Sequence, residues 1–511
     1  MFIRPALETD AVFDPIRTTN YLGIWYLSSL LKEKGYNVRC LDEVVRNGGF
    51  EKRVLFERTI RNGEISETQI DMTFEEFRER KMADFKLSEE DFLAKYSAFR
   101  KNGEVNRTMV RTGNPIQETL KEIWKWKPDV VGIPLVATAN YVQSVKLGKA
   151  IKDTFPAVKV VYGGQHFLAG AEDFLREYPW VDHIVINDAI TVIEGIVEGR
   201  RSEKIIDGGF QEMSAYPLLD PALIEENGYP SEPTYTFTSS GRKTVDFMFS
   251  RGCFRHCDFC VAGCQKGNHL TRAYDRLDAQ LQLFKEHGYE EIVIQDDAFI
   301  PADERDAKKH LERILGLMKK YGFFWQNNGG IDFELLSDEV MDQFIRYNQS
   351  GEGRLTSLYV PFNPRGAVEQ KKQSAAGVMI EKHNAHLENL KRLRNAGVYV
   401  FSSEIIGTPE HTVEVLEEDI RLHEQLVRDG YLDAALTLVA TLLPATKWYR
   451  EHANGIVDVR DYAGYSLFTV HARTRNISDP RIIERFLIRR AKSLNSVQQT
   501  YPWGSAFPNT K

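Results

Sequence analysis

The chain has 511 residues, a charged fraction of 27% and a net charge of -7. A chain of this length folds as two domains or more, and so small a net charge excludes the basic footprint of a nucleic-acid-binding protein. No stretch approaches the roughly 20 apolar residues of a membrane span, and the start MFIRPALETD lacks the pattern of a signal peptide, so we expect a cytoplasmic protein.

The first part of the chain predicts a doubly wound α/β domain over residues 1–207. A strand–helix–strand pattern occupies residues 1–41, and apolar strands follow at 129–135, 159–162 and 183–186. An amphipathic stretch between the first two of these strands fits a crossover helix, so we expect a Rossmann-like parallel sheet.

Two segments interrupt or end this pattern. Residues 50–110 are charged and helix-prone without a strand pattern, which indicates a helical insertion. Residues 208–242 are rich in Gly, Pro and Ser and carry little periodicity, which predicts a domain linker.

The second half predicts a partial (βα)6 barrel over residues 243–450, because an apolar strand followed by an amphipathic helix recurs along it. The predicted strands are 245–249, 291–294, 323–326, 357–361, 398–406 and 434–443, and the predicted helices are 274–286, 306–321, 337–347, 382–395 and 412–428. Residues 451–511 predict a C-terminal helical extension with one basic helix at 481–492.

Four of the five cysteines lie in the segment SRGCFRHCDFCVAGC, directly after the first barrel strand. In a barrel of this kind the loops after the strands form the active-site face. Three thiolates can hold three irons of a four-iron cluster and leave the fourth open, whereas a fully ligated electron-transfer cluster uses four cysteines. The clustering therefore points to a metal site.

The spacing Cys253-x3-Cys257-x2-Cys260, with Phe259 before the last cysteine, resembles the signature of the radical S-adenosylmethionine (SAM) enzymes. The resemblance implies a [4Fe-4S] cluster on these three cysteines, SAM at the open iron with Phe259 nearby, and a 5'-deoxyadenosyl radical that abstracts a substrate hydrogen. It also implies an external one-electron donor such as flavodoxin or ferredoxin.

Other assignments of the cysteines stay open. A zinc site would take Cys264 as the fourth thiolate, and a ferredoxin-type cluster uses tighter spacing; neither predicts the barrel that follows. With three cysteine ligands, Cys264 is a spare thiol near the site. Cys40 lies in an apolar strand, which predicts a buried core residue.

Two further segments resemble SAM-binding motifs of this family. Asp296 and Asp297 follow the second barrel strand and resemble its acidic motif near the SAM amino group, although two acids there could equally cap the next helix. In SSEIIGTPE, the residues Glu404, Ile405 and Gly407 resemble the strand that flanks the adenine, where glycine permits close approach of the backbone.

The fourth barrel strand departs from the family pattern. The run YVPFNPRG at 359–366 lacks the usual Gly-x-Glu-Ser, and Arg365 in it is either a substrate clamp or a solvated loop residue.

The first domain resembles the cobalamin-binding domain found ahead of many radical SAM enzymes, through KPDVVGI at 127–133 and VVYGGQH at 160–166. In such a sheet the ligand lies at the carboxyl ends of the strands, where glycines allow close approach. The resemblance implies that cobalamin contacts come from the ends of two neighbouring strands: Leu135, Val136, Thr138, Gly163, Gly164 and His166.

The familiar Asp-x-His-x-x-Gly motif is absent, and His166 is the first histidine of the chain. Cobalamin would therefore lack a protein histidine as its lower ligand. A domain that kept its fold and lost the cofactor is the rival interpretation. A nucleotide-binding domain is less favoured, because Gly163-Gly164 is not a Gly-x-Gly-x-x-Gly loop that opens a helix.

These features together predict a cobalamin-dependent C-methyltransferase acting on an unactivated carbon, with a cobalamin-dependent radical cyclase or rearrangement enzyme as the first alternative. A radical SAM enzyme whose first domain no longer binds cobalamin and a non-catalytic zinc-binding scaffold are the others. The substrate would be a small molecule, a lipid or a natural-product intermediate, and no catalytic side chain is identified. Some aromatic residues would line an apolar substrate channel or pack in the core: Tyr449, Tyr465, Phe468 and Trp503.

Overall fold

A computed structural model describes residues 1–13, 21–100, 103–229, 241–264, 269–361 and 378–497. Arg365 and Trp503 lie outside these ranges, and so does the side chain of Cys264. The chain divides into two compact units, each described by itself: the first comprises Met1–Pro230, Cys257–Gln265 and Thr441–Ala472, and the second comprises the rest.

The first unit is built on a parallel sheet with the order β10-β9-β8-β7-β1-β3 in the described part of the chain. Because β1 pairs with both β3 and β7, the strand order reverses at β1, and ligands bind such sheets beside the carboxyl ends at that point. This arrangement confirms the predicted doubly wound domain. The strands are β1 Phe2–Arg4, β3 Cys40–Asp42, β7 Val130–Pro134, β8 Lys159–Gly163, β9 His183–Ile186 and β10 Ile205–Asp207.

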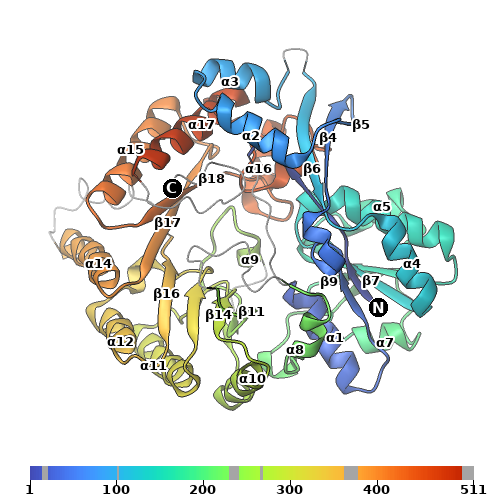
Figure 1. Ribbon diagram of the computed structural model, residues 1–511, viewed down its shortest axis with the longest axis horizontal. Coiled ribbons are helices and arrows are strands. Elements are labelled where there is room, and N and C mark those ends of the chain that lie inside the picture. The colour runs from blue at the N-terminus through green and yellow to red at the C-terminus, as the bar shows by residue number, and fades with distance from the viewer. Residues whose placement is uncertain (14–20, 101–102, 230–240, 265–268, 362–377, 498–511) are drawn as a thin grey trace. The chain divides into compact units, whose positions relative to one another are not determined.

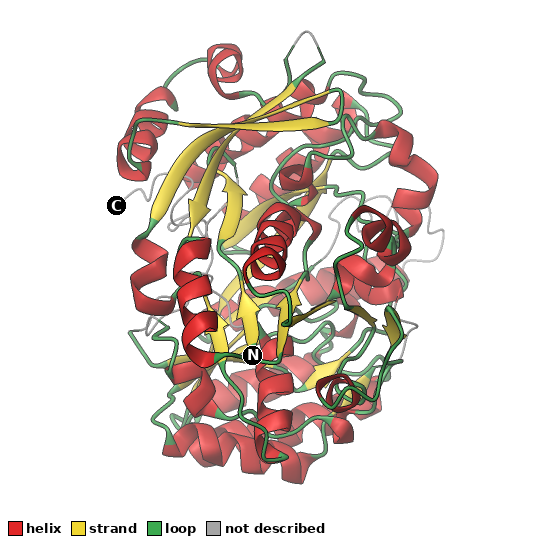
Figure 2. Cartoon of the chain, turned by 90° about the vertical axis from the view of Figure 1, so that its right-hand side faces the viewer, coloured by secondary structure: helices red, strands yellow, loops and turns green. Residues whose placement is uncertain are grey.

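Helices pack on this sheet because the strands are apolar on both faces, as in parallel sheets generally (Figure 2). Val131, Val160 and Ile184 of three neighbouring strands are fully buried. Cys40 in β3 is 2% exposed, which confirms it as a core residue, and burial raises the pKa of its thiol. The helices are α1 Leu22–Glu33, α4 Ile116–Trp126, α5 Tyr141–Thr154, α6 Ala171–Glu177 and α7 Ile193–Val197.

The prediction of a wholly helical insertion over residues 50–110 is wrong. An antiparallel sheet with the order β2-β6-β4-β5 occupies much of it, and its described α-helices are α2 Phe74–Asp84 and α3 Glu89–Tyr96. Asn62 and Gly63, both with positive φ, make the two-residue turn between β4 and β5. The side chains of β5 are almost all exposed, so no apolar alternation marks it in the sequence. The strands are β2 Leu7–Asp10, β4 Arg53–Arg61, β5 Glu64–Gln69 and β6 Val105–Thr112.

The predicted domain boundaries also shift. Within the predicted linker, α8 Pro221–Glu225 buries Leu223, and the Asn227 side chain accepts a hydrogen bond from the Asp42 backbone N–H at 2.7 Å, so residues 208–229 belong to the first unit. Residues 441–472, which include α16 Lys447–His452, also belong to the first unit. The barrel therefore ends near residue 440, ahead of the predicted boundary at 450.

The second unit is a partial barrel in which the strand order follows the chain order, β11-β14-β15-β16-β17-β18, with every neighbouring pair parallel. The helices lie outside these strands (Figure 1), as expected of successive βα units. The strands are β11 Thr244–Phe247, β14 Glu291–Ile294, β15 Phe324–Asn327, β16 Arg354–Tyr359, β17 Tyr399–Ile406 and β18 Ala434–Val439; the helices are α10 Tyr274–Glu286, α11 Glu304–Tyr321, α12 Asp338–Gln349, α14 Val378–Asn395, α15 Val413–Arg428 and α17 Pro480–Val497.

The segment with the four cysteines leaves the barrel after β11. A short antiparallel pair, β12 Ser250–Arg251 and β13 Leu270–Thr271, flanks it, and α9 Val261–Cys264 lies within it.

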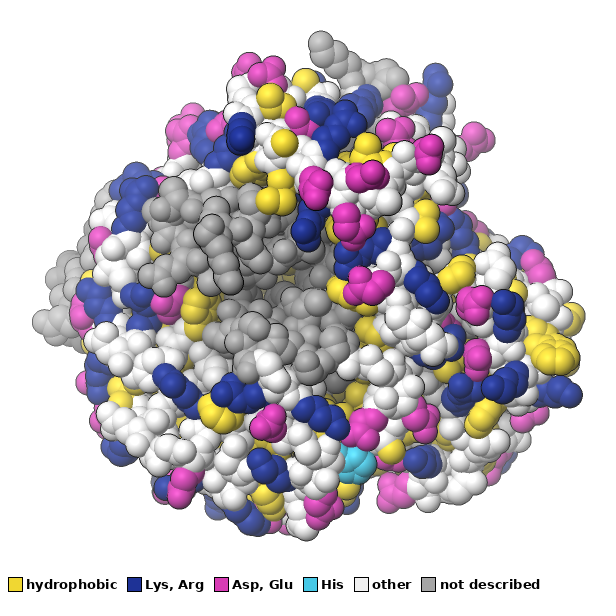
Figure 3. Space-filling view, in the orientation of Figure 1, with side chains coloured by type: hydrophobic (Ala, Val, Ile, Leu, Met, Phe, Trp, Pro, Cys, Tyr) yellow, Lys and Arg dark blue, Asp and Glu magenta, His cyan; other side chains and the backbone are white. Residues whose placement is uncertain are grey.

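No helix in the described residues is long and apolar enough to cross a bilayer. On the face shown in Figure 3, basic and acidic side chains are interspersed, and neither sign forms a continuous field.

Candidate functional site

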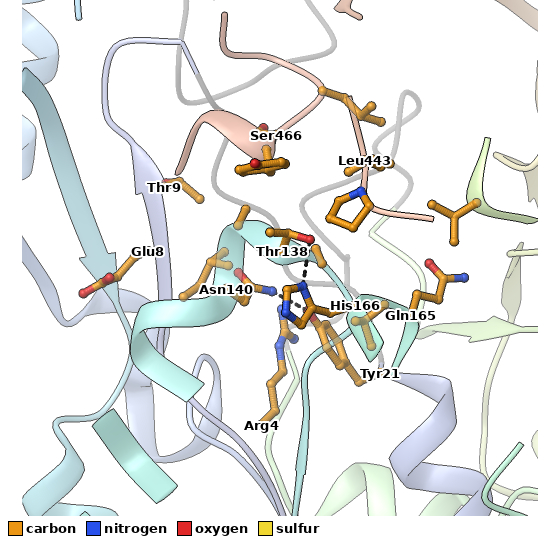
Figure 4. Close-up of a pocket in the computed structure, with 18 residues that line it drawn as sticks. Arg4, Glu8, Thr9, Tyr21, Thr138, Asn140, Gln165, His166, Leu443 and Ser466 are labelled. Carbon is orange, nitrogen blue, oxygen red and sulfur yellow. Dashed lines mark hydrogen bonds between the residues drawn. The ribbon is translucent and has the colours of Figure 1, made fainter. Parts of the chain in front are cut away.

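A cavity of about 300 Å³ opens in the first unit beside the carboxyl ends of β1 and β7 (Figure 4). This is the position at which the strand order reverses, so the cavity lies where a doubly wound sheet binds its ligand. The residues that follow β1, β7 and β8 line one part of it, and three distant segments line the rest: Arg4, Leu7, Glu8, Thr9, Tyr21, Val136, Ala137, Thr138, Ala139, Asn140, Gln165, His166, Val261, Leu443, Pro444, Tyr465, Ser466 and Leu467.

His166 is held in a fixed orientation at this cavity. Its Nδ1 lies 3.0 Å from Thr138 Oγ1, and its ring packs edge-on against Tyr141. Burial lowers the pKa of His166 to about 4, so the imidazole is neutral near pH 7. Its Nε2 makes no hydrogen bond to any described residue and can therefore serve a ligand.

Arg4, at the end of β1, supplies a fixed cation at the cavity. Its Nη1 donates a hydrogen bond to Asp42 at 2.9 Å, and its guanidinium lies 4.0 Å from the centre of the Tyr21 ring. Asn140 in turn donates to the Tyr21 hydroxyl at 2.9 Å. The three side chains thus form a polar part of the lining whose rotamers are fixed by neighbours (Figure 4).

The six residues predicted to bind cobalamin separate into two groups. Val136, Thr138 and His166 line the cavity, whereas Leu135 is fully buried behind it. The two glycines do not line the cavity either: Gly164 has a φ of 123°, and a Cβ there would lie 2.5 Å from the Leu135 carbonyl oxygen. The glycine at 164 is therefore required by the chain's own packing.

Sequence reasoning missed a large part of the lining. Arg4, Leu7 and Thr9 could have been found, because residues at the end of the first strand lie beside the switch point of such a sheet. The role of residues 443–467 could not have been predicted, since nothing in their composition links them to a domain more than 200 residues earlier. They are placed there by contacts such as the stacking of Tyr462 on Tyr141, with ring centres 4.0 Å apart. Of the aromatic residues considered for a channel, Tyr465 lines the cavity and Phe468 is buried.

The three predicted cluster ligands carry thiols that are not in disulfides. Cys257 is exposed, and Cys253 and Cys260 are partly exposed. The Cys260 N–H donates to the Cys257 carbonyl at 3.0 Å, which makes a turn between them. In the described residues no three His, Cys, Asp or Glu side chains converge on a single ion. A four-iron cluster does not require three side chains to converge on one ion, because each cysteine binds a different iron. Three accessible thiols therefore suit such a cluster.

The second half of the cysteine segment packs against α16. The Trp448 N–H donates to the Asp258 carbonyl at 3.1 Å, Lys447 pairs with the Asp258 carboxylate at 2.9 Å, and the Phe259 and Trp448 rings lie 5.2 Å apart. Val261, the residue after Cys260, lines the cavity of the first unit. The segment that carries Cys257 and Cys260 is therefore part of the cavity wall.

Asp296 and Asp297 lie after β14 and bind the chain just ahead of Cys253. The Asp296 carboxylate accepts hydrogen bonds from the backbone of Phe249 and Ser250, and Asp297 accepts one from the Gly252 N–H at 3.0 Å. The helix-cap alternative is wrong, because α11 begins later and its N-cap is Asp303. Burial raises the pKa of Asp296, whereas the hydrogen bonds from Ser250 and Phe249 lower it and favour the carboxylate form.

The predicted adenine-flanking residues on β17 point to different sides. Glu404 is buried against the helices: it accepts hydrogen bonds from Thr437 at 2.8 Å and from Arg490 of α17 at 2.7 Å. Burial opposes its ionisation, but Arg490 and His423 outweigh that effect and lower the pKa of Glu404 to about 2. Since side chains alternate along a strand, Ile405 is the better candidate for a cofactor contact.

Gly407 has a φ of 72°, and a Cβ there would lie 3.1 Å from Ile483 of α17. The need for glycine at this position therefore arises from backbone conformation and from the helix that packs on it.

The similarity of the chain to known proteins supports a cobalamin site at this cavity. The family model of the B12 binding domain matches residues 98–197, which include the loops after β7 and β8. An uncharacterized methyltransferase of Pyrococcus horikoshii is 23% identical over 390 residues, or 73% of this chain and 79% of that protein. The chain is therefore similar, over most of its length, to enzymes that combine a cobalamin-binding domain with a radical SAM domain.

Two further proteins match most of the chain. The anaerobic magnesium-protoporphyrin IX monomethyl ester cyclase of Rubrivivax gelatinosus is 22% identical over 408 residues, or 75% of this chain and 69% of that protein. Among solved structures, the fold resembles that of the radical SAM methyltransferase TsrM from Kitasatospora setae, determined with cobalamin and a [4Fe-4S] cluster, with a TM-score of 0.50, 14% identity and coverage of 95% of this chain and 84% of that chain.

The cavity lining suits the cofactor of this family. A corrin is a large ring with an apolar face and a rim of amide groups, and the cavity combines apolar side chains with hydrogen-bonding ones. Thr9 Oγ1 is buried at this lining and has no hydrogen-bond partner among the described residues, so a ligand group would satisfy it.

Proposed function

We propose that this protein is a cobalamin-dependent radical SAM methyltransferase that transfers a methyl group to an unactivated carbon of a small-molecule, lipid or natural-product substrate. Cys253, Cys257 and Cys260 hold a [4Fe-4S] cluster, cobalamin occupies the cavity at β1 and β7, and an external flavodoxin or ferredoxin supplies electrons. When bound, the cluster with SAM supplies the radical that opens the substrate C–H bond, and cobalamin carries the methyl group.

One observation carries the proposal. Val261 directly follows the third predicted cluster ligand and lines the cavity that suits cobalamin. Because Cys260 and Val261 are consecutive in the chain, the segment that holds the cluster also borders the cobalamin cavity. A methyl donor and a radical source must act on the same substrate atom, so this proximity is what the reaction needs.

The residues that line the cavity would bind the cofactor and fix its orientation. Arg4, Asn140 and the neutral His166 present fixed polar groups to the rim of the cofactor, while Leu443, Pro444 and Leu467 exclude water from its neighbourhood. Burial keeps His166 uncharged, which suits hydrogen bonding more than proton transfer near pH 7.

A cobalamin-dependent radical cyclase is the second candidate, favoured by the similarity to the Rubrivivax gelatinosus cyclase over three quarters of the chain. The two reactions differ in what they make from SAM. Methylation yields S-adenosylhomocysteine together with 5'-deoxyadenosine, whereas ring closure does not require the former.

The test is anaerobic reconstitution with iron, sulfide and hydroxocobalamin, followed by desalting and measurement of bound iron and cobalt. We expect about four irons and one cobalt per chain. With reductant and methyl-labelled SAM, we expect label in the cobalamin fraction and formation of S-adenosylhomocysteine. Retention of iron without cobalt would overturn the role of cobalamin, and zinc in place of iron would overturn the whole proposal.

A pair of matched variants tests the position of the cofactor. Val136 lines the cavity and is 40% exposed, so Val136→Trp fills the site without disturbing the core. Val54 is 39% exposed in the same unit and does not line the cavity. We expect Val136→Trp to lose cobalamin and Val54→Trp to keep it, with iron unchanged in both; equal cobalamin retention would place the cofactor elsewhere.

A further inference from the structure

We propose that Asp296 is a positioning residue for the iron-sulfur cluster: it fixes the backbone at which the cysteine segment leaves the barrel and does not contact SAM. The inference rests on the proposed function, because it assumes a cluster on Cys253, Cys257 and Cys260. It assigns different roles to two neighbouring acids that the sequence presents as equivalent.

The cysteine segment is closed at its base by a short structure, here called the neck, which consists of residues 249–252 and 269–272. Ser250 pairs with Thr271 and Arg251 with Leu270 in an antiparallel bridge, and the Arg272 N–H donates to the Phe249 carbonyl at 3.0 Å. Cys253 is the next residue after the neck. Any shift of the neck is therefore passed directly to the first cluster ligand.

Asp296 binds the neck with both carboxylate oxygens. Oδ1 accepts from the Phe249 N–H at 2.8 Å, and Oδ2 accepts from the Ser250 N–H at 2.8 Å and from Ser250 Oγ at 2.7 Å. Asp296 is 2% exposed and Ser250 is fully buried. Because this carboxylate is enclosed and turns both oxygens toward the neck, it is not accessible to the amino group of SAM.

Asp297 differs from its neighbour in exposure. Its side chain is exposed, and among the described residues Oδ2 accepts a hydrogen bond from the Gly252 N–H while Oδ1 accepts none. Its other oxygen can therefore reach a ligand, so of the two acids only Asp297 keeps the geometry for a SAM contact.

The loop that carries Asp296 is itself held against the next strand. A Cβ at Gly329 would lie 1.7 Å from the Asp296 carbonyl oxygen, so the loop after β15 packs directly on the Asp296 backbone. On the other side, His269 Nε2 lies 2.7 Å from the Ala298 carbonyl and joins the second strand of the neck to the same loop. The loop after β14 thus holds the neck, and the loop after β15 supports it from behind, both at the carboxyl ends of the strands where the active-site loops of such barrels lie.

Asp296→Asn tests the inference because an amide has only one acceptor oxygen, whereas a carboxylate has two. Two backbone N–H groups point at the two carboxylate oxygens, and an asparagine must turn its NH₂ toward one of them. One buried donor then loses its acceptor, which loosens the neck without a change of side-chain size. Asp297→Asn is the matched control, since it makes the same change one residue later on an exposed side chain.

The full-length variants are reconstituted anaerobically with iron and sulfide, and iron content, the EPR spectrum of the reduced cluster and its change on addition of SAM are measured. For Asp296→Asn we expect iron retention to fall by about two-fold or more and the EPR signal to broaden, with an unchanged SAM response per loaded cluster. For Asp297→Asn we expect wild-type iron and a weakened SAM response.

Circular dichroism and a thermal melt show whether Asp296→Asn folds. Ser250→Ala removes only one of the three hydrogen bonds to Asp296 and gives a milder version of the same test, with a smaller loss of iron in the same direction. Wild-type iron and EPR in both variants, or loss of the SAM response in Asp296→Asn with a normal cluster, would overturn the inference. Absence of iron in the wild-type protein would instead overturn the proposed function.

Discussion

Arg107 and Asp461, which are 354 residues apart in the chain, form a bidentate ion pair in the interior of the first unit. Arg107 Nε lies 2.7 Å from Oδ1 of Asp461 and Nη2 lies 2.6 Å from Oδ2, and each side chain is 1% exposed. Nη2 also donates to the Val470 carbonyl at 2.6 Å. The pair therefore ties the antiparallel sheet of the insertion to the segment 441–472, which supplies part of the cavity lining.

Loss of one partner of this pair should destabilise the protein strongly. In Asp461→Asn the buried guanidinium loses one of its two carboxylate partners, since Asp10 Oδ2 still lies 3.0 Å from Nη1. We therefore expect a loss of up to about 3–5 kcal/mol, the cost of breaking an enclosed pair. Chemical denaturation monitored by circular dichroism measures the change. Asp153→Asn is the control, because its pair with Lys149 is solvent-exposed and such a pair contributes about 0–1 kcal/mol. Equal effects of the two substitutions would contradict a structural role for the buried pair.

The two neighbouring glycines at the carboxyl end of β8 should differ in their tolerance of alanine. A Cβ at Gly164 would lie 2.5 Å from the Leu135 carbonyl oxygen at a φ of 123°, whereas one at Gly163 would meet Val185 at an ordinary 3.5 Å. We expect Gly164→Ala to cost about 1–3 kcal/mol of stability and to weaken cobalamin retention. Gly163→Ala should melt close to the wild type; a thermal melt in which both variants match the wild type would show that the loop can rearrange.

Iron binding should depend on three of the cysteines and not on the fourth. Single substitutions of Cys253, Cys257 and Cys260 by alanine each remove one ligand of the proposed cluster, and we expect each to lose most of the iron after reconstitution. Cys264→Ala is the control and should retain it. If Cys264→Ala loses metal to the same extent, a four-thiolate site such as zinc becomes the better assignment.

The buried histidine His471 should make the protein sensitive to acid. Its Nε2 accepts a hydrogen bond from the Leu442 N–H at 3.2 Å, and burial lowers its pKa to about 4. An unfolded histidine has a pKa of about 6.5, so the unfolded state binds the proton first. The stability contribution is complete above about pH 6.5 and is lost as the pH falls toward 4, by up to about 1.4 kcal/mol per pH unit.

His471→Gln removes the titrating group and keeps a side chain that can accept a hydrogen bond. Denaturation curves recorded between pH 7 and pH 4.5 should show a shallower loss of stability than in the wild type. Parallel curves for the two proteins would mean that His471 does not titrate differently in the folded and unfolded states.

Periodicity and motifs predict some of the site residues and not others. The strand ends around Val136 and His166 were found because parallel strands place their carboxyl ends at one edge of the sheet, whatever the details of packing. The motif pattern could not separate Asp296 from Asp297, since both acids fit it and only the enclosure of one by Phe249 and Ser250 distinguishes them. The motif pattern also gave no sign that the Glu404 carboxylate binds Arg490, because this partner lies 86 residues away.

The sequence by itself determined the two α/β sheets, the cysteine spacing and the family they indicate, because these depend on local periodicity and on residues close together in the chain. The tertiary structure alone decided that β4, β5 and β6 join β2 in an antiparallel sheet, that residues 441–472 return to the first unit, and that Val261 borders the cavity. The physical reason is that these features depend on pairing and burial between distant segments. Nothing in the composition of either partner specifies such contacts.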